Sequence, residues 1–181
     1  MALEANNVGD FAFGSAQASS VTLSFWVYSS LTGTFGGAVE NAAENRNYPF
    51  SYTISSSNTW TQVSVTIPGD TTGTWNTNNS AGIWVNFNLG SGSTYLGTGG
   101  SWGSSFVSGT TGSVGIVGTS GATFYVTGVQ FETGSAATPF EQRPLTIEQQ
   151  LCFRYCYRWT ASATQTYNYI TTLRCYSTTN G

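Results

Sequence analysis

Hydrophobic and polar side chains alternate along several short segments of this chain. In residues 21–28 the odd-numbered positions are apolar, and the even-numbered positions carry Thr22, Ser24, Trp26 and Tyr28. Successive side chains of a β-strand point to opposite faces, so this period of two predicts a strand with one buried face. We therefore expect the apolar set to point into a core and the other four side chains to point away from it.

The same pattern recurs and predicts an all-β fold, a two-sheet sandwich of antiparallel strands. Pro49 lies within one segment, and because proline cannot donate to a ladder, we expect its strand at a sheet edge. The inward phase changes at Thr127 and Gly128, which predicts a β-bulge there. Leu89 is expected to point inward at the end of its strand. The seven expected strands cover residues 21–28, 31–37 (a turn and strand entry), 46–54, 60–67, 83–89, 113–117 and 122–132.

Residues 90–112 interrupt the alternation with a stretch dominated by Gly, Ser and Thr, in which Tyr95, Trp102 and Phe106 are scattered. Structureless loops of this length are uncommon in compact domains. We expect this loop to be functional or to pack on another part of the protein.

The character of the sequence changes after Pro139. Thr146 stands three residues before Gln149, the spacing of a capping box, and predicts a helix over residues 146–154. Residues 157–160 and 167–176 alternate again and predict a hairpin. We therefore expect a sandwich domain over residues 1–140, and an appendage of helix plus hairpin over residues 141–181. Because the chain ends at Gly181 with no closing element, the appendage is interpreted as truncated.

Composition removes several classes of function. Only 7% of the residues are charged, against roughly 25% in an average globular protein, and the formal net charge is -3 with no Lys or His. The lack of a basic stripe argues against nucleic acid as a partner. No apolar run reaches the roughly 20 residues of a membrane span, so membrane insertion is not expected. The three cysteines, Cys152, Cys156 and Cys175, are interpreted as buried free thiols.

Candidate catalytic residues are scarce. Triads that use His are impossible here, and a glycosidase would need two carboxylates across a cleft. Glu40 and Glu44 form the only close acidic pair, and we expect them in a solvated polar loop. The prediction is a protein without enzymatic activity, metal or cofactor.

Aromatic side chains beside polar ones give the clearest functional signal. Trp26 and Trp84 fall on the polar faces of their strands, and Trp60 lies near a strand end. Packing under the long loop or in a subunit interface is the favoured interpretation, because Trp and Tyr are enriched in both places. Sugar recognition is the alternative, since a flat ring covers the apolar face of a pyranose. The candidate carbohydrate-binding residues are Trp26, Trp84, Asn86, Asn88, Trp75, Tyr95 and Trp102.

Three stretches resemble virion appendage proteins of tailed bacteriophages, such as tail fibres, whose body is similar to a carbohydrate-binding-module jelly roll. They are VTLSFWVYSSLTGTFG from Val21, NTWTQVSVTIPGDTTGTWNTNNSAGIWVNFNLGSGS from Asn58, and ATFYVTGVQFETGSAATPFEQRPLTIEQQLCFRYC from Ala122. The resemblance covers most of residues 1–158. It implies that the sandwich is a jelly roll. It also implies a homo-oligomeric virion protein, usually a trimer, that contacts other virion proteins.

Two features depart from these relatives. The relatives carry further strands before residues 3–13, so we expect the sandwich to lack N-terminal strands, which either a neighbouring subunit or sequence outside this chain supplies. Related sugar-binding modules often hold a calcium ion through an Asp pair on the last strand. Thr127 and Gly128 stand at that position, so no ion is expected.

These observations predict a phage virion structural protein, a tail fibre or a capsid or tail decoration component. It would mediate self-assembly and, as a further role, attachment to host-surface glycans, and it would be located in the virion. The alternative is a carbohydrate-binding module of a secreted polysaccharide-active protein.

Overall fold

The computed structural model describes residues 1–154 and residue 156. The chain divides into two compact units, residues 1–141 and 142–181. The first unit contains every strand of the described part, and these strands form mainly antiparallel sheets, so the all-β prediction is confirmed.

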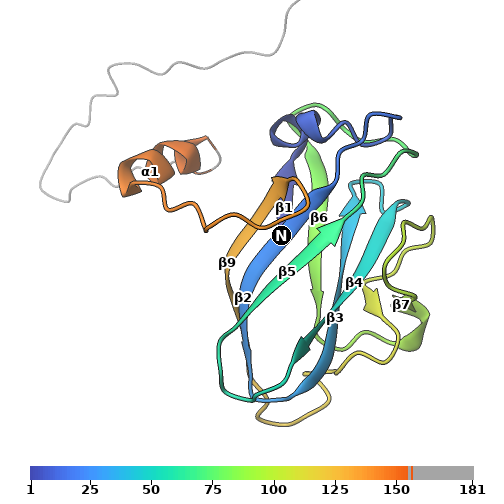
Figure 1. Ribbon diagram of the computed structural model, residues 1–181, viewed down its shortest axis with the longest axis vertical. Helices are drawn as coiled ribbons and strands as arrows, with labels where there is room; N and C mark the ends of the chain where they lie inside the picture. Colours follow the sequence, from blue (N-terminus) through green and yellow to red (C-terminus); the bar gives the residue numbers. More distant parts are fainter. Residues whose placement is uncertain (155, 157–181) are drawn as a thin grey trace, which may run out of the picture. The chain divides into compact units, whose positions relative to one another are not determined.

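Two sheets make up the body of the first unit (Figure 1). One has four strands in the order β1-β6-β3-β4, and the other has three in the order β5-β2-β9. A parallel pair, β7 and β8, lies beside them. The strands are β1 (Ala2–Glu4), β2 (Val21–Ser29), β3 (Gly33–Asn41), β4 (Asn47–Ile54), β5 (Thr61–Ile67), β6 (Ala81–Asn88), β7 (Leu96–Gly97), β8 (Gly109–Thr110) and β9 (Phe124–Thr133). Short 3-10 helices cover Ala5–Asn7, Gly9–Phe11 and Ser93–Tyr95.

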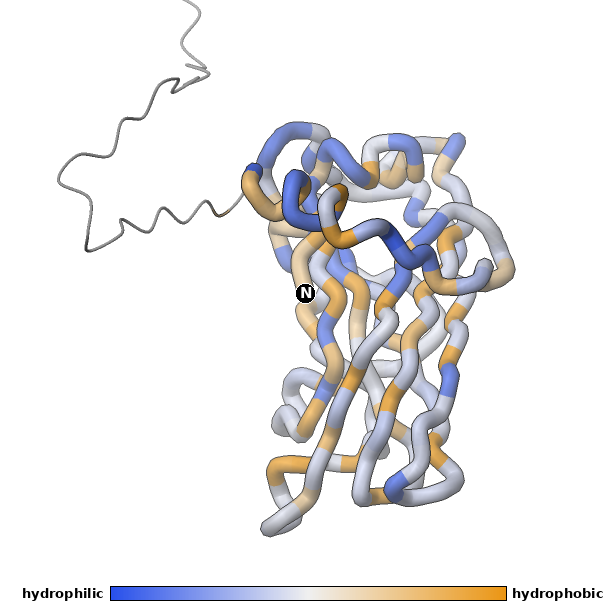
Figure 2. The backbone as a smooth tube through the Cα atoms, turned by 90° about the vertical axis from the view of Figure 1, so that its left-hand side faces the viewer, coloured by the Kyte–Doolittle hydropathy of each residue, from blue (hydrophilic) through white to orange (hydrophobic). Residues whose placement is uncertain are grey.

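The core lies between these sheets and follows the predicted alternation. Every odd-numbered residue of β2 from Val21 to Val27 is fully buried. Phe25 of the three-stranded sheet meets Tyr52 and Phe87 of the four-stranded sheet edge-on, with ring centroids 5.1 and 5.0 Å apart. The same alternation of apolar and polar positions is visible along the strands in Figure 2. Interdigitated aromatic rings from both inner faces therefore hold the sheets together.

Two local predictions are confirmed. β4, which contains Pro49, is an edge strand of its sheet. The ladder between β2 and β9 shifts its register opposite Phe25, where Gly128 adopts a φ of 56°. Glycine takes this left-handed conformation without the clash that a Cβ would cause. The resulting bulge lets Phe124 and Phe131, which lie on opposite sides of it, both pack against the core.

Several boundaries were predicted wrongly. β1, β7 and β8 were missed, and β3 is a full strand rather than a strand entry. Residues 113–117 form no strand in the described chain, because Val114 and Val117 donate single hydrogen bonds to Thr34 and to Leu89 instead of following one partner. Leu89 is 37% exposed, since the chain turns outward directly after β6.

The second unit contains one described helix, α1 (Leu145–Phe153). The capping-box prediction is wrong: Pro144 is the N-cap, and its carbonyl accepts from the N–H groups of Ile147 and Glu148. Thr146 therefore lies inside the first turn and not at its start. Cys152 and Cys156 are free but exposed, contrary to the expectation of buried thiols. Cys175 and the predicted hairpin lie outside the described residues. Within the described chain, no helix is long and apolar enough to cross a membrane.

Candidate functional site

A row of exposed aromatic rings crosses the outer face of the three-stranded sheet. Tyr28 of β2 is paired with Tyr125 of β9, and the register on the other side places Trp60, just before β5, opposite Tyr28. Outward positions on β2, on β9 and directly before β5 therefore bring three rings together. Trp26 stands one outward position further along β2 and is 39% exposed. We call Trp26, Tyr28, Trp60 and Tyr125 the aromatic row.

Three rings of the aromatic row, those of Tyr28, Trp60 and Tyr125, touch but are not coplanar. The Tyr28 centroid lies 5.6 Å from that of Trp60 and 5.6 Å from that of Tyr125, with interplanar angles of 53° and 64°. Trp60 is 45% exposed and Tyr125 is 54% exposed, while Tyr28 between them is half-buried and donates a 3.3 Å hydrogen bond to Asn58. The row is thus an uneven apolar surface with a polar margin.

The rest of this sheet face is covered by the chain itself. Thr22 donates to the carbonyl of Gly134, and Thr66 donates to that of Ser135, at 2.8 and 3.0 Å. The carboxylate of Glu132 accepts from Gln130 and from the hydroxyl and N–H of Thr138. These hydrogen bonds, that from Gln130 above all, lower the pKa of Glu132. The segment after β9 therefore covers one part of the face and leaves the aromatic row in solvent.

The candidate residues on β6 lie on the opposite side of the sandwich and are covered. Trp84 and Asn86 are half-buried. Asn88 is 5% exposed, and its Oδ1 accepts from the N–H groups of Gly90 and Ser91 at 2.8 and 2.9 Å. This amide holds the start of the long loop and is almost fully buried. Its assignment as a carbohydrate-binding residue stays a prediction.

Trp75 and Trp102 belong to an aromatic cluster that packs parts of the fold together. Both rings meet Phe13 edge-on, at 4.9 and 5.7 Å, and they meet each other at 5.5 Å. Their indole N–H groups donate to the carbonyls of Thr72 and Pro68. Tyr95 stands apart on the long loop, 49% exposed, against Phe106.

The predicted carbohydrate-binding residues therefore fall in four separate places. Only Trp26 belongs to the aromatic row, which also includes Trp60 from the earlier interpretation. Sequence reasoning missed Tyr28 and Tyr125 as site residues. The available signal was the shared outward phase of Trp26 and Tyr28, combined with the pairing of β2 and β9.

The expectation that Glu40 lies in a solvated loop is wrong. Glu40 lies in β3, is 1% exposed, and faces Trp84 and Asn47 across the ladders, whereas Glu44 stands on an exposed turn. Burial raises the pKa of Glu40; a hydrogen bond from Asn86 opposes this and Glu44 adds to it. Within the described residues Glu40 Oε1 and Asn47 Nδ2 have no hydrogen-bond partner. The close acidic pair of the sequence therefore has one enclosed and one exposed carboxyl.

Asp70 is the other buried acid. It is 2% exposed and receives two hydrogen bonds from Arg46, of 2.7 and 2.8 Å, and two from Thr72. Burial alone would raise the pKa of Asp70, but these bonds and the positive charge of Arg46 outweigh it, and the pKa is lowered. This ion pair joins two loops and is structural. The described residues contain no group of three acidic, His or Cys side chains that could hold a metal.

Comparisons with known proteins found no match to this chain. No protein-family model, no curated protein and no solved structure matches this chain.

Proposed function

We propose that this chain is a structural protein of a phage virion, a tail fibre or a capsid or tail decoration component, that assembles through the aromatic row. The observation that carries the proposal is the exposure of three touching rings on one open sheet face. Contiguous exposed apolar patches of soluble proteins mark interaction sites. The row would contact copies of the same chain, in a trimer as the resemblance implies, and other virion proteins.

The fold and the surface support a jelly-roll module built for contact. β2, β5 and β9 belong to one sheet and β3, β4 and β6 to the other, so the chain crosses repeatedly between sheets, as in a jelly roll. Only 7% of the residues are charged. Tyr and Trp are enriched in protein interfaces and charged residues are depleted at interface centres. Low charge and exposed rings thus favour association over catalysis.

Host-surface glycan attachment is the second role of the proposal. It rests on the same rings, because a ring face can cover the apolar face of a pyranose. The interplanar angles of 53° and 64° mean that neighbouring rings present edges to one another and not one flat platform. This geometry favours the assembly role over the glycan role. A carbohydrate-binding module of a secreted polysaccharide-active protein remains the alternative function, and a monomer that binds glycans through Trp60 would support it.

The experiment is to measure the mass of the full chain by size-exclusion chromatography with light scattering. We expect an oligomer, and we expect Trp60→Ala combined with Tyr125→Ala to yield a monomer with an unchanged circular dichroism spectrum. The matched control is Tyr95→Ala combined with Phe106→Ala, an exposed aromatic pair elsewhere on the surface, which should remain oligomeric. A well-folded monomeric wild type would contradict the assembly role.

A further inference from the structure

The two sheets of the sandwich end in four edge strands, β1, β4, β5 and β9, and three of these edges are guarded against pairing with another chain. β4 contains Pro49, and Asn47 at its start exchanges two main-chain hydrogen bonds with Gly103 of the long loop. β1 is three residues long, and β9 is interrupted by the bulge at Gly128. Proline, covering loops, short strands and bulges are the devices by which natural sheets protect their edges. These three edges are therefore poor templates for a further strand.

The fourth edge strand, β5, is regular and uncharged. Its seven residues pair with β2 in one unshifted register, from Thr61 opposite Val27 to Ile67 opposite Val21. Its sequence, TQVSVTI, contains no proline and no glycine, and the chain has no lysine, a common guard of exposed edges. Every second residue of an antiparallel strand points its N–H and C=O groups away from its neighbour. Among the described residues, no main-chain hydrogen bond reaches β5 from that side.

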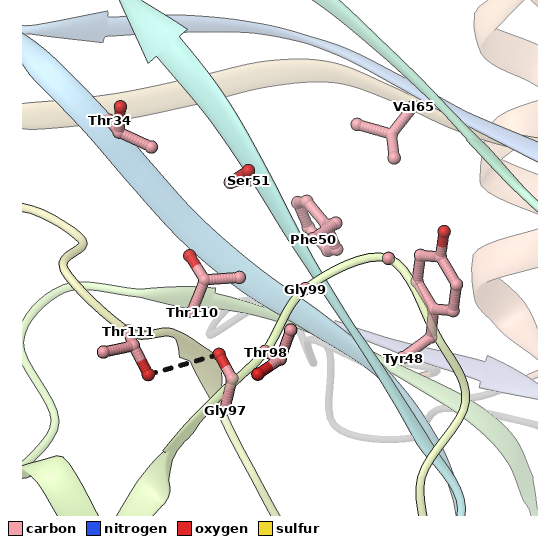
Figure 3. A pocket seen from close by; sticks show the side chains of 11 residues that line it. Thr34, Tyr48, Phe50, Ser51, Val65, Gly97, Thr98, Gly99, Thr110 and Thr111 are labelled. Carbon is pink, nitrogen blue, oxygen red and sulfur yellow. Dashed lines mark hydrogen bonds between the residues drawn. The ribbon is translucent and has the colours of Figure 1, made fainter.

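The inner side chains of β5 are covered unevenly. Val63 and Ile67 are buried, but Val65 between them is only half-buried. Val65 borders a cavity of about 520 Å³ that also borders Ser51 of β4 and Thr98 of the long loop (Figure 3). A further strand at the free edge of β5 would cover Val65. It would therefore bury apolar surface as well as satisfy main-chain groups.

The sequence of β5 is complementary to itself when two copies run antiparallel. Gln62, Ser64 and Thr66 are exposed and neutral, and their side chains both donate and accept hydrogen bonds. In a pair centred on Ser64, each Ser64 faces the other, and Gln62 of one copy faces Thr66 of the other. On the inner side the same register places Val63 opposite Val65. Apolar side chains thus meet apolar ones and polar side chains meet polar ones, with no like charges opposed.

We propose that β5 pairs antiparallel with β5 of a second copy, so that two three-stranded sheets join into one sheet of six strands. This pairing goes beyond the proposed function, because it uses the main chain of a strand edge and not the ring contacts of the aromatic row. Its two-fold symmetry doubles the number of copies in whatever assembly the row forms. Trp60 directly precedes β5, and in this register it lies opposite Pro68 of the second copy. The two contacts are therefore continuous, and loss of Trp60 weakens both.

The test measures the mass of the full chain by light scattering and its amide hydrogen exchange by NMR. We expect a mass that is an even multiple of that of one chain, and slower exchange of every second amide of β5 as the protein concentration rises. Ser64→Lys places two like charges opposite each other at the centre of the pair, so it should halve the mass with an unchanged circular dichroism spectrum. Ser64→Glu should do the same, and an equimolar mixture of the two variants should return to the wild-type mass.

The matched control is Thr53→Lys, which adds the same charge at an exposed position of β4 and should keep the wild-type mass. An unchanged mass in both Ser64 variants would overturn the pairing, and so would a mixture that stays at half the wild-type mass. If the Ser64 variants keep the wild-type mass while Trp60→Ala combined with Tyr125→Ala yields a monomer, the pairing fails and assembly through the aromatic row stands. If the Ser64 variants halve the mass and the Trp60, Tyr125 variant keeps it, the pairing stands and the aromatic row fails. A monomeric wild type would overturn both.

Discussion

The two outer faces of the sandwich differ in their residues and in how far the chain covers them. On the four-stranded sheet, Glu40, Asn86 and Asn88 are buried or half-buried beside the long loop. On the three-stranded sheet, Trp60 and Tyr125 stay about half exposed. The polar face is covered and the aromatic face is open, which is the reverse of what solvation alone would favour. The difference supports the proposed assembly through the aromatic row, whereas the covered face serves stability.

The largest expected effect on stability concerns the buried ion pair between Arg46 and Asp70. Arg46→Ala leaves the carboxylate of Asp70 buried without its charge partner, which typically costs about 3–5 kcal/mol. We expect a loss of this size in the free energy of unfolding, measured by urea denaturation. Because the pKa of Asp70 is lowered, this stabilisation is present above its ordinary 3.8 and is lost as the pH falls below it.

The matched control for this pair is Arg143→Ala. Arg143 and Glu148 are 3.5 Å apart and both are more than 40% exposed, at 44% and 47%. Exposed pairs contribute about 0–1 kcal/mol. If Arg46→Ala and Arg143→Ala lose equal free energies of unfolding, the buried pair stabilises the fold no more than the exposed pair does. That result would contradict the structural role of the Arg46–Asp70 pair.

Two tryptophan-to-alanine variants compare the open face with the aromatic cluster around Phe13. Trp102→Ala removes a ring packed against Phe13, Tyr48 and Trp75 and a hydrogen bond to Pro68, so it should destabilise the fold by about 2–3 kcal/mol. Trp60→Ala should change stability by only about 0.5 kcal/mol while weakening self-association. Denaturation and light scattering on both variants measure the two effects. A Trp60→Ala variant that is as unstable as Trp102→Ala would show that the open face stabilises the fold as the aromatic cluster does.

The alternation of residues made much of the fold predictable. β2, β5 and β6 were found because each has one face in the core, and Pro49 and Gly128 marked an edge and a bulge through their own backbone chemistry. Strands of two or three residues, such as β7 and β8, were missed because they are too short to show a period. Glu40 was misplaced because the glycine-rich start of β3 carries no alternation.

The candidate site was less predictable for a different reason. A period of two places a side chain on an outer face but does not say which loop crosses that face. Trp26 and Trp84 look alike in sequence, yet the first is exposed and the second is half-buried. Trp84 stands between Ala2 of β1 and Glu40 of β3, whereas the segment after β9 leaves Trp26 exposed, so contacts between residues far apart in the chain decide this difference. Such contacts leave no local pattern to read.

The buried carboxyl of the covered face should lower stability at neutral pH. Because the pKa of Glu40 is raised above 4.5, the folded state holds the proton more tightly than the unfolded chain does, and stability falls as the pH rises from 4.5 through the folded pKa. Glu40→Gln mimics the protonated form and should add about 1–2 kcal/mol at neutral pH. The stability gained by Glu40→Gln over the wild type should disappear at acidic pH. Denaturation curves measured at a series of pH values would show this loss. Glu44→Gln should act in the same direction but less, since Glu44 is exposed and acts on Glu40 only through its charge.

The smallest effect compares two tyrosine hydroxyls. Tyr52 is 6% exposed, and its hydroxyl has no hydrogen-bond partner among the described residues; burial also raises its pKa. Tyr52→Phe removes an unpaired buried polar atom and should therefore be neutral or stabilising, by up to about 1 kcal/mol. Tyr28→Phe on the open face loses only the 3.3 Å bond to Asn58 and should be neutral or slightly destabilising. Thermal unfolding of both variants measures the difference. A marked loss of stability in Tyr52→Phe would mean that a polar partner reaches this hydroxyl, and the interior between the sheets would then be less dry than its aromatic packing implies.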